Sequence, residues 1–278
     1  MIVEKAENIF DKIHRSDFEE LANIASLYDD ISSEELCKYY DDKNQILEDL
    51  KKEWEKSLEE DAPNYSVYGH PAYLNESFVC WKTYSRKYVK LIKQYLKTKD
   101  CEINVGEVEN ILDMGCGCAY STIALKAVFP NAHIIASNIK DTLQYKIDKY
   151  VTDNIDGCDI IDEKDTFNLE KIDMIFASEF FEHLVSPIDL LSKIIQTYKP
   201  KYIIFANTFT QMAIGHFKKY NVYGKWEDGH STSRAFNKCL RLNGYCKIDT
   251  GFFNNRPNIY KLCGENDSKN TRYNILEE

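Results

Sequence analysis

The first 104 residues alternate hydrophobic and polar positions with the period of an α-helix. Three stretches follow this period and predict helices, namely residues 4–30, 32–60 and 77–97. The second opens on Ser32-Ser33-Glu34-Glu35, a capping hydroxyl ahead of two acids, and Pro63 stands just beyond its end. Residues 64–73, rich in aromatic side chains and bounded by Pro and Gly, predict a loop. We therefore expect residues 1–104 to form an N-terminal helical cap.

Beyond residue 104 the pattern changes to short apolar runs that alternate with helix-like segments. The runs that predict strands are 110–113, 133–137, 173–177, 202–206, 245–248 and 258–263. The segments that predict helices are 121–129, 141–151, 187–198 and 231–242. This alternation predicts an α/β core over residues 105–264, with a parallel sheet covered by helices on both faces. The last two runs have no helix between them and predict an antiparallel hairpin, and residues 265–278 predict a polar tail.

Composition and charge narrow the class of protein. The chain of 278 residues is 44% hydrophobic and 29% charged, which excludes a disordered or fibrous protein. It has no uncharged apolar window of about 18 residues, so no membrane-spanning helix is expected. Residues 1–62 hold 19 acidic and 8 basic side chains (−11), and residues 63–278 hold 26 and 27 (+1), which gives the net charge of −10. Such a chain offers little attraction to nucleic acid.

The cysteines and the N-terminal residues indicate the cellular compartment in which the protein is expected. The nine cysteines include no CxxC pair, and the first residues lack the basic flank and apolar stretch of a secretory signal. An odd number of cysteines without an export signal predicts reduced thiols in a cytoplasmic protein. A disulfide scaffold is therefore not expected.

The most informative motif is a glycine-rich turn between the first predicted strand and the helix after it. Residues 109–122 read ENILDMGCGCAYST. Glycines permit positive φ and the close approach of a ligand, and a helix start offers free N–H donors. A dinucleotide-binding turn requires a third glycine where Tyr120 stands, and a Walker phosphate loop requires a Gly-Lys-Ser/Thr ending. Neither ligand class fits this turn.

The remaining pattern, acid-x-Gly-x-Gly, resembles motif I of the class I S-adenosylmethionine-dependent methyltransferases. The resemblance covers about residues 105–263 and implies a Rossmann-like, seven-stranded, mostly parallel sheet with an antiparallel C-terminal hairpin. It implies S-adenosylmethionine as the cofactor, its ammonium near Asp113 and its carboxylate on the N–H groups of the turn. Asn138 stands where the family usually has an acid for the ribose. The cofactor-binding residues implied are Asp113, Gly115, Gly117, Ala119, Asn138, Asp162, Asp165 and Ser178.

A second motif follows the strand at 173–177, at the sheet edge where ligands bind in open sheets. Glu179, Glu182 and His183 share one face of a helical turn. Their spacing is similar to that in small-RNA 2′-O-methyltransferases and ubiquinone-pathway O-methyltransferases, in which these positions bind a divalent metal. The resemblance implies that Glu179, Glu182, His183 and His230 bind Mg²⁺, Mn²⁺, Fe²⁺ or Zn²⁺. A metal-free site remains open, with His183 or His230 as general base and Glu179 beside the acceptor.

These features predict an enzyme that transfers a methyl group to an oxygen of a small polar metabolite. A sugar, a phosphorylated intermediate and a quinone precursor are all compatible acceptors, and the oligomeric state stays open. Two alternatives remain, namely methylation of an RNA ribose hydroxyl and a catalytically inactive binding protein. The lack of a basic surface argues against the first, and Ala119 and Asn138 motivate the second. The aromatic residues Tyr65, Tyr68, His70 and Tyr73 either cover the ligand or fix the cap to the sheet.

Overall fold

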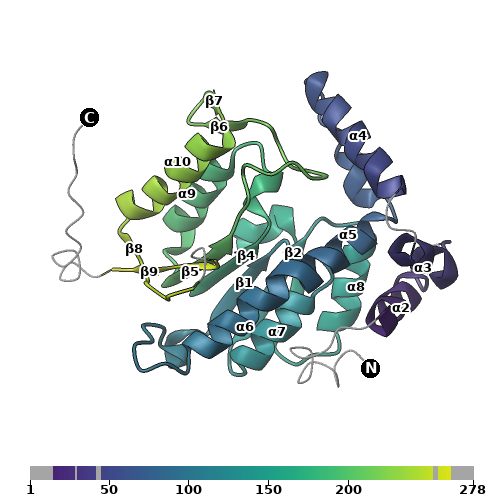
Figure 1. The fold of residues 1–278 in the computed structure, drawn as a ribbon. Coiled ribbons are helices and arrows are strands. Elements are labelled where there is room, and N and C mark those ends of the chain that lie inside the picture. The colour runs from purple at the N-terminus through teal and green to yellow at the C-terminus, as the bar shows by residue number, and fades with distance from the viewer. Residues whose placement is uncertain (1–14, 29, 42–44, 253–255, 264–278) are drawn as a thin grey trace.

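A seven-stranded sheet lies at the centre of the computed structural model, which describes residues 15–28, 30–41, 45–252 and 256–263 (Figure 1). Its strands are β1 (Asn110–Met114), β2 (His133–Asn138), β3 (Cys158–Asp162), β4 (Met174–Ser178), β5 (Tyr202–Ala206), β8 (Tyr245–Lys247) and β9 (Asn258–Leu262). Their order is β3-β2-β1-β4-β5-β9-β8. The first five are parallel, and β9 runs antiparallel between β5 and β8. The predicted Rossmann-like sheet with its antiparallel hairpin is confirmed.

Three strands of the structure have no counterpart in the hydrophobic pattern. β3 is an edge strand in which Asp159 is exposed and the residues after it are only partly buried, so its sequence carries no continuous apolar run. β6 (Tyr220–Val222) and β7 (Lys225–Glu227) form a separate antiparallel pair. A strand of three residues is too short to show a period.

Nine helices of the described residues surround the sheet. They are α2 (Arg15–Ala25), α3 (Ser33–Asp41), α4 (Gln45–Glu59), α5 (Tyr73–Cys80), α6 (Arg86–Tyr95), α7 (Tyr120–Val128), α8 (Leu143–Thr152), α9 (Pro187–Tyr198) and α10 (Gly229–Leu242). The stretch predicted as one helix over 32–60 contains both α3 and α4, and a π-helical turn, Trp81–Ser85, joins α5 to α6. Residues 4–14 of the first predicted helix lie outside the described residues. None of the helices described is both long and apolar enough to cross a membrane.

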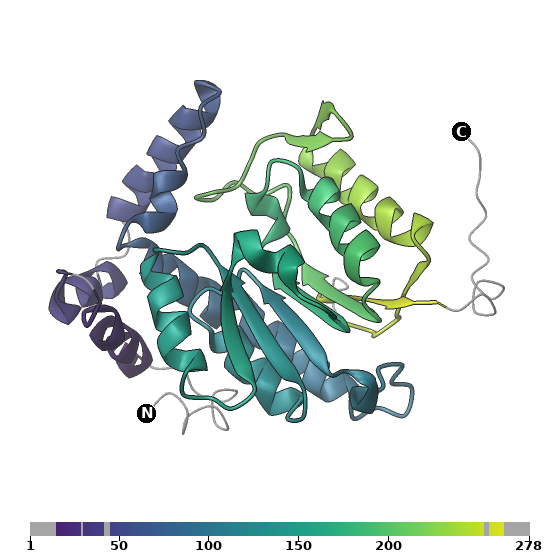
Figure 2. The ribbon, with the colours of Figure 1, turned by 180° about the vertical axis from the view of Figure 1, so that it is seen from behind.

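α6, α7 and α8 cover one face of the sheet and α9 and α10 the other, whereas α4 stands apart from both layers (Figures 1 and 2). Because side chains alternate along a strand, Ile111 and Ile134 pack with α6, α7 and α8, whereas Leu112 and Ile135 pack with α9 and α10. α6 lies beside α7, and α2 contacts α8. Helices from the predicted cap thus belong to one covering layer. The boundary at residue 104 remains a proposal, and the predicted tail 265–278 lies outside the described residues.

Two of the nine cysteines are joined, contrary to the expectation of reduced thiols. Cys246 on β8 forms a disulfide with Cys263, just after β9. The two Cα atoms are 5.9 Å apart, within the range that a disulfide requires. The odd cysteine count requires only one unpaired thiol, so it could not exclude this bond. The other seven cysteines form no disulfide.

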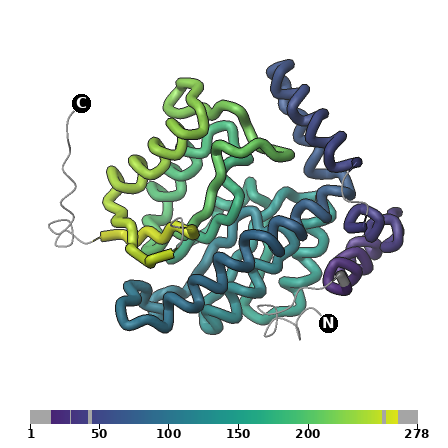
Figure 3. The backbone as a smooth tube through the Cα atoms, in the orientation of Figure 1, coloured from purple at the N-terminus to yellow at the C-terminus, as the bar shows by residue number. Residues whose placement is uncertain are grey.

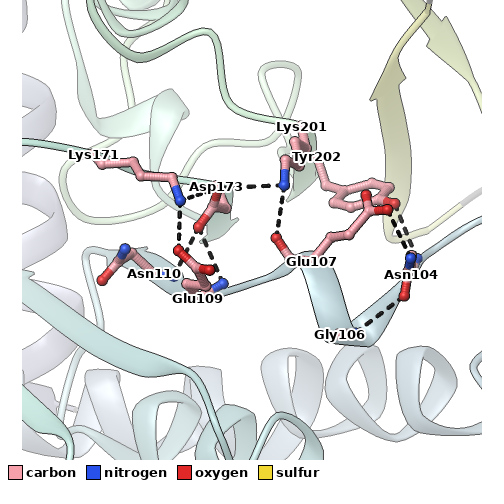
Figure 4. Close-up of polar contacts among 9 residues, drawn as sticks. All are labelled: Asn104, Gly106, Glu107, Glu109, Asn110, Lys171, Asp173, Lys201 and Tyr202. Atoms are coloured by element: carbon pink, nitrogen blue, oxygen red, sulfur yellow. Dashed lines mark hydrogen bonds and ion pairs between the residues drawn. The ribbon is translucent and has the colours of Figure 1, made fainter.

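A buried carboxylate joins three strands at the amino edge of the sheet (Figure 4). Asp173, which is 2% exposed, accepts hydrogen bonds from the backbone N–H groups of Glu109 and Asn110, both at 3.1 Å. Its other oxygen lies 3.4 Å from Lys171 Nζ and 3.8 Å from Lys201 Nζ. The carboxylate therefore holds the starts of β1, β4 and β5 in register, and the cavity described below lies at the opposite edge.

We expect Asp173→Ala to lower the free energy of unfolding by roughly 3 kcal/mol, because it leaves the partly buried N–H groups of Glu109 and Asn110 without this acceptor. The matched control is Glu109→Ala, whose side chain also contacts Lys171 but is 69% exposed. That change should cost less than about 1 kcal/mol. Urea denaturation of both variants measures the difference, and equal losses would contradict this role for Asp173.

Candidate functional site

A cavity of about 400 Å³ opens at the carboxyl edge of the parallel strands. It lies over the junction of β1 and β4, where the strand order reverses and where open α/β sheets bind ligands. One end is lined by the glycine turn and the ends of β1, β2 and β4. The other is lined by residues 65–85 and 211–216. Its volume suits a small-molecule ligand.

The glycine turn has the left-handed backbone that its sequence predicts. Gly115 and Gly117 have φ of +64° and +67°, and Ala119, in place of a third glycine, has φ of +58°. A Cβ on Gly115 would lie 2.5 Å from the Phe180 ring, so a side chain there is excluded. A Cβ on Gly117 would have Ser77 as its nearest neighbour at 3.8 Å and would project into the cavity. The turn thus presents bare backbone to a ligand.

Asp113 ends β1 directly below this turn and is 1% exposed. Its Oδ2 accepts hydrogen bonds from the hydroxyls of Ser121 and Thr122, both at 2.7 Å, in the first turns of α7. Burial raises the pKa of Asp113 to about 6, although the two hydroxyls act in the opposite direction. A carboxylate that lines the cavity in this way can attract a cationic group.

Asn138, predicted at the cofactor's ribose, is engaged within the protein. Its Nδ2 donates to the carbonyl of Gly117 at 2.9 Å and to Oδ2 of Asp148 at 2.8 Å, which uses both amide hydrogens. Its Oδ1 accepts the N–H of Ile139. Asn138 lines the cavity but braces the glycine turn against α8. A ribose contact through Nδ2 would require one of these bonds to break.

Asp148 is a site residue that no motif identified. It is fully buried on α8, and it also accepts a hydrogen bond from the Cys116 thiol at 3.3 Å. Burial raises the pKa of Asp148 well above its ordinary value. The signal in the sequence is an acid on the apolar stripe of a helix, beside Ile147.

Two predicted cofactor residues do not line the cavity. Asp162 caps the 3₁₀ turn Glu163–Asn168 by accepting the N–H of Lys164, and Asp165 accepts a hydrogen bond from Asn168. Glu163 lines the cavity in their place. Ser178, predicted at the end of the fourth family strand, does line it, and its hydroxyl lies 2.7 Å from that of Ser85.

Glu179 and Glu182 lie together beyond β4. The left-handed backbone of Glu179 (φ +50°) turns the chain away from the strand, and its carboxylate accepts hydrogen bonds from Tyr88 and Thr208, both at 3.1 Å. Glu182 is fully buried, and one of its oxygens accepts the N–H of Thr208 at 2.7 Å. Burial and the charge of Glu179 raise the pKa of Glu182 well above its ordinary value. Only Glu179 lines the cavity.

His183 faces a different set of partners from the one predicted. Its Nδ1 lies 3.0 Å from the hydroxyl of Tyr68, and its ring packs edge-on against His216 with centroids 4.6 Å apart. Burial, with a smaller effect of His216, lowers the pKa of His183 well below its ordinary value. His216, which the sequence did not single out, also lines the cavity.

The predicted metal site is not assembled. His230 is exposed at the start of α10 and does not line the cavity, so it cannot join Glu179 or His183. The catalytic role expected of His230 stays a prediction that this geometry does not support. Across the part of the chain that the structure describes, no group of three or more His, Cys, Asp or Glu is placed to hold a metal ion.

The fold and the glycine-lined cavity define an α/β protein of the class I methyltransferase type. A family model described as "Methyltransferase domain" matches residues 80–253. The chain belongs to this methyltransferase domain family. No curated protein matches it.

Solved structures agree on the fold. An O-methyltransferase family protein from Burkholderia thailandensis is 8% identical with a TM-score of 0.51, and the match covers 81% of this chain and 70% of that one. The CurJ carbon methyltransferase is 11% identical with a TM-score of 0.50, covering 78% and 66%. The first is named an O-methyltransferase family protein and the second a carbon methyltransferase, so the likeness supports the fold and leaves the acceptor open.

The raised pKa of Asp113 predicts a pH-dependent stability in the absence of ligand. The folded state holds a proton that the unfolded state releases, so the free energy of unfolding should fall as the pH rises from about 4 to about 6. Asp113→Asn keeps an oxygen acceptor for both hydroxyls and removes this penalty. The free energy of unfolding of Asp113→Asn, relative to that of the wild type, should therefore be higher at pH 7.5 than at pH 4 by up to about 3 kcal/mol.

Urea denaturation at the two pH values measures this difference, with the exposed Asp165→Asn as the control for surface charge. A difference between wild type and Asp113→Asn that is the same at both pH values would contradict the account of this carboxyl.

Proposed function

We propose that the protein binds S-adenosylmethionine in this cavity and transfers its methyl group to a hydroxyl oxygen of a small polar metabolite. The observation that carries the proposal is the bare backbone at Gly117 beside the buried carboxylate of Asp113. Family membership supports the reaction class. The cytoplasmic location expected from the sequence stays a prediction.

The residues present fit the amino-acid end of this cofactor. Asp113 would pair with its ammonium, and the turn Gly115–Ala119 would accommodate its carboxylate because no side chain fills the space over Gly117. When bound, the cofactor supplies an electrophilic methyl group on a positively charged sulfur. Ser178 also lines the cavity, as do the residues of the turn and the two histidines His183 and His216.

The other end of the cavity suits an uncharged hydroxyl acceptor. Tyr68, Tyr73, His183, Gln211 and His216 line it and offer hydrogen-bonding groups. Burial raises the pKa of Tyr68 and lowers that of both histidines, so these groups are uncharged near neutral pH. Among the described residues that line the cavity there is no Lys or Arg. We therefore favour a neutral metabolite over a phosphorylated one or an RNA backbone, both of which call for cations.

We assign no step to a divalent metal, because the four predicted ligands do not meet in the cavity. Glu179 and His183 line it, whereas Glu182 does not, and His230 is exposed elsewhere. What the chain supplies is a position for the acceptor and an imidazole to take its proton. Alignment of acceptor, methyl and sulfur should provide most of the rate enhancement.

We expect Gly117→Ala to lower the affinity for S-adenosylmethionine by roughly tenfold or more, or about 1.4 kcal/mol. The added methyl group would occupy the open space over the turn. The matched control is Gly224→Ala. Gly224 also has a positive φ (+82°), but it lies in the exposed β6–β7 turn, where an added Cβ would have no neighbour within 4 Å. Both variants carry similar backbone strain, so only loss of the ligand site distinguishes them. Titration calorimetry checks this, and equal affinities would contradict the site.

Methyl transfer is tested with methyl-labelled S-adenosylmethionine and a panel of phenols, sugar alcohols, sugar phosphates and single-stranded RNA. We expect label on a neutral hydroxyl compound. Transfer to RNA, or cofactor binding without transfer to any oxygen, would contradict the proposal in favour of one of the two alternatives.

A further inference from the structure

The backbone of His216 is held by hydrogen bonds on two sides. It lies in the segment between β5 and β6, which extends toward α4 in Figure 3. Its carbonyl accepts a hydrogen bond from Nε1 of the fully buried Trp54 at 2.7 Å, and its N–H donates to the carbonyl of Ala213. The residue is 7% exposed. The backbone that carries this imidazole is therefore fixed from both sides.

The protonation state of the His216 ring follows from a single contact. Nδ1 lies 2.7 Å from the backbone oxygen of Gln211. A carbonyl oxygen can only accept a hydrogen bond, so Nδ1 must carry the proton. In the neutral imidazole the lone pair is then on Nε2. Nε2 makes no hydrogen bond with any residue described, although the side chain lines the cavity.

The tautomer of His183, unlike that of His216, is not determined by a hydrogen bond to a carbonyl oxygen. Its Nδ1 faces the hydroxyl of Tyr68, which can either donate or accept, and that hydroxyl also lies 3.5 Å from the carbonyl of Gly215. Its tautomer is therefore not fixed by its surroundings. A Cβ on Gly215 would clash with both Tyr68 and His183, so the residue before His216 is the one that lets this pair approach.

We propose that Nε2 of His216 is the general base that removes the proton from the acceptor hydroxyl. This inference rests on the proposed methyl transfer and adds the residue that activates the acceptor. The carbonyl of Gln211 orients the base by holding Nδ1–H. An imidazole fixed in the correct tautomer by an acceptor on its other nitrogen is an arrangement suited to general-base catalysis.

In the proposed step, a proton passes from the acceptor hydroxyl to Nε2 of His216 and a methyl group passes from sulfur to the acceptor oxygen. The O–H bond breaks, its proton bonds to Nε2, and its electron pair forms the new bond from oxygen to the methyl carbon. The bond from methyl to sulfur breaks with its pair retained on sulfur. One positive charge moves from the sulfonium to the imidazolium. The carboxylate of Glu179 raises the pKa of His216 against the effect of burial, and so favours the imidazolium.

The tautomer is tested without an acceptor by long-range ¹H–¹⁵N NMR of the whole protein, with the His216 signals assigned by their loss in His216→Asn. We expect a protonated Nδ1 and an unprotonated Nε2 in the neutral ring, with and without S-adenosylhomocysteine. A ring protonated at Nε2 would overturn the proposal.

The catalytic role is tested with His216→Asn, whose amide nitrogen can still donate to the Gln211 carbonyl while no group replaces Nε2. With any oxygen acceptor found in the panel above, we expect kcat to fall by roughly a hundredfold or more and the cofactor affinity to stay within about twofold. His133→Asn, at the opposite edge of the sheet, should match the wild type.

The outcomes separate this inference from the proposed function. An active wild type with an equally active His216→Asn variant would overturn the role of His216 alone. A wild type that binds no S-adenosylmethionine, or transfers no methyl group to oxygen, would overturn the proposed function and this inference with it.

Discussion

The bend that leads from β1 into α7 is the constraint on which the site depends. The chain bends through left-handed backbone at Gly115, Gly117 and Ala119. A side chain at Gly115 would meet the Phe180 ring, and one at Gly117 would enter the cavity. Asp113 is fixed from below by hydroxyls of α7, and Asn138 fixes the turn from the side through Asp148. Buried polar groups thus hold an unusual backbone in one shape, and this shape leaves the turn open to a ligand.

The acceptor end is assembled from segments far apart in the sequence. Trp54 on α4 holds the backbone of His216, Tyr68 contacts His183, and Glu179 arrives from the end of β4. The first two contacts each join residues more than a hundred positions apart. The N-terminal helices therefore complete the cavity, and the segment between β5 and β6 supplies the histidine that the proposed chemistry needs.

The sequence predicted most of the sheet because buried strands carry apolar runs, and it predicted the glycine turn because glycine adopts left-handed backbone most readily. It missed β3, whose edge position leaves it partly polar. It singled out His230 and not His216, because spacing along the chain carries no information on which loop folds toward the cavity. It assigned Asn138 to a ligand, whereas the bonds to Gly117 and Asp148 depend on packing between β2 and α8. Local rules thus identified the cofactor end, and tertiary contacts decided the rest.

The most direct measurement is a crystal structure of the protein soaked with S-adenosylhomocysteine. The account predicts density for the homocysteine moiety over the bare backbone of Gly117, with its ammonium beside Asp113 and its sulfur directed toward His183 and His216. A turn closed by side chains, or one that holds a phosphate group while this ligand binds elsewhere, would contradict it.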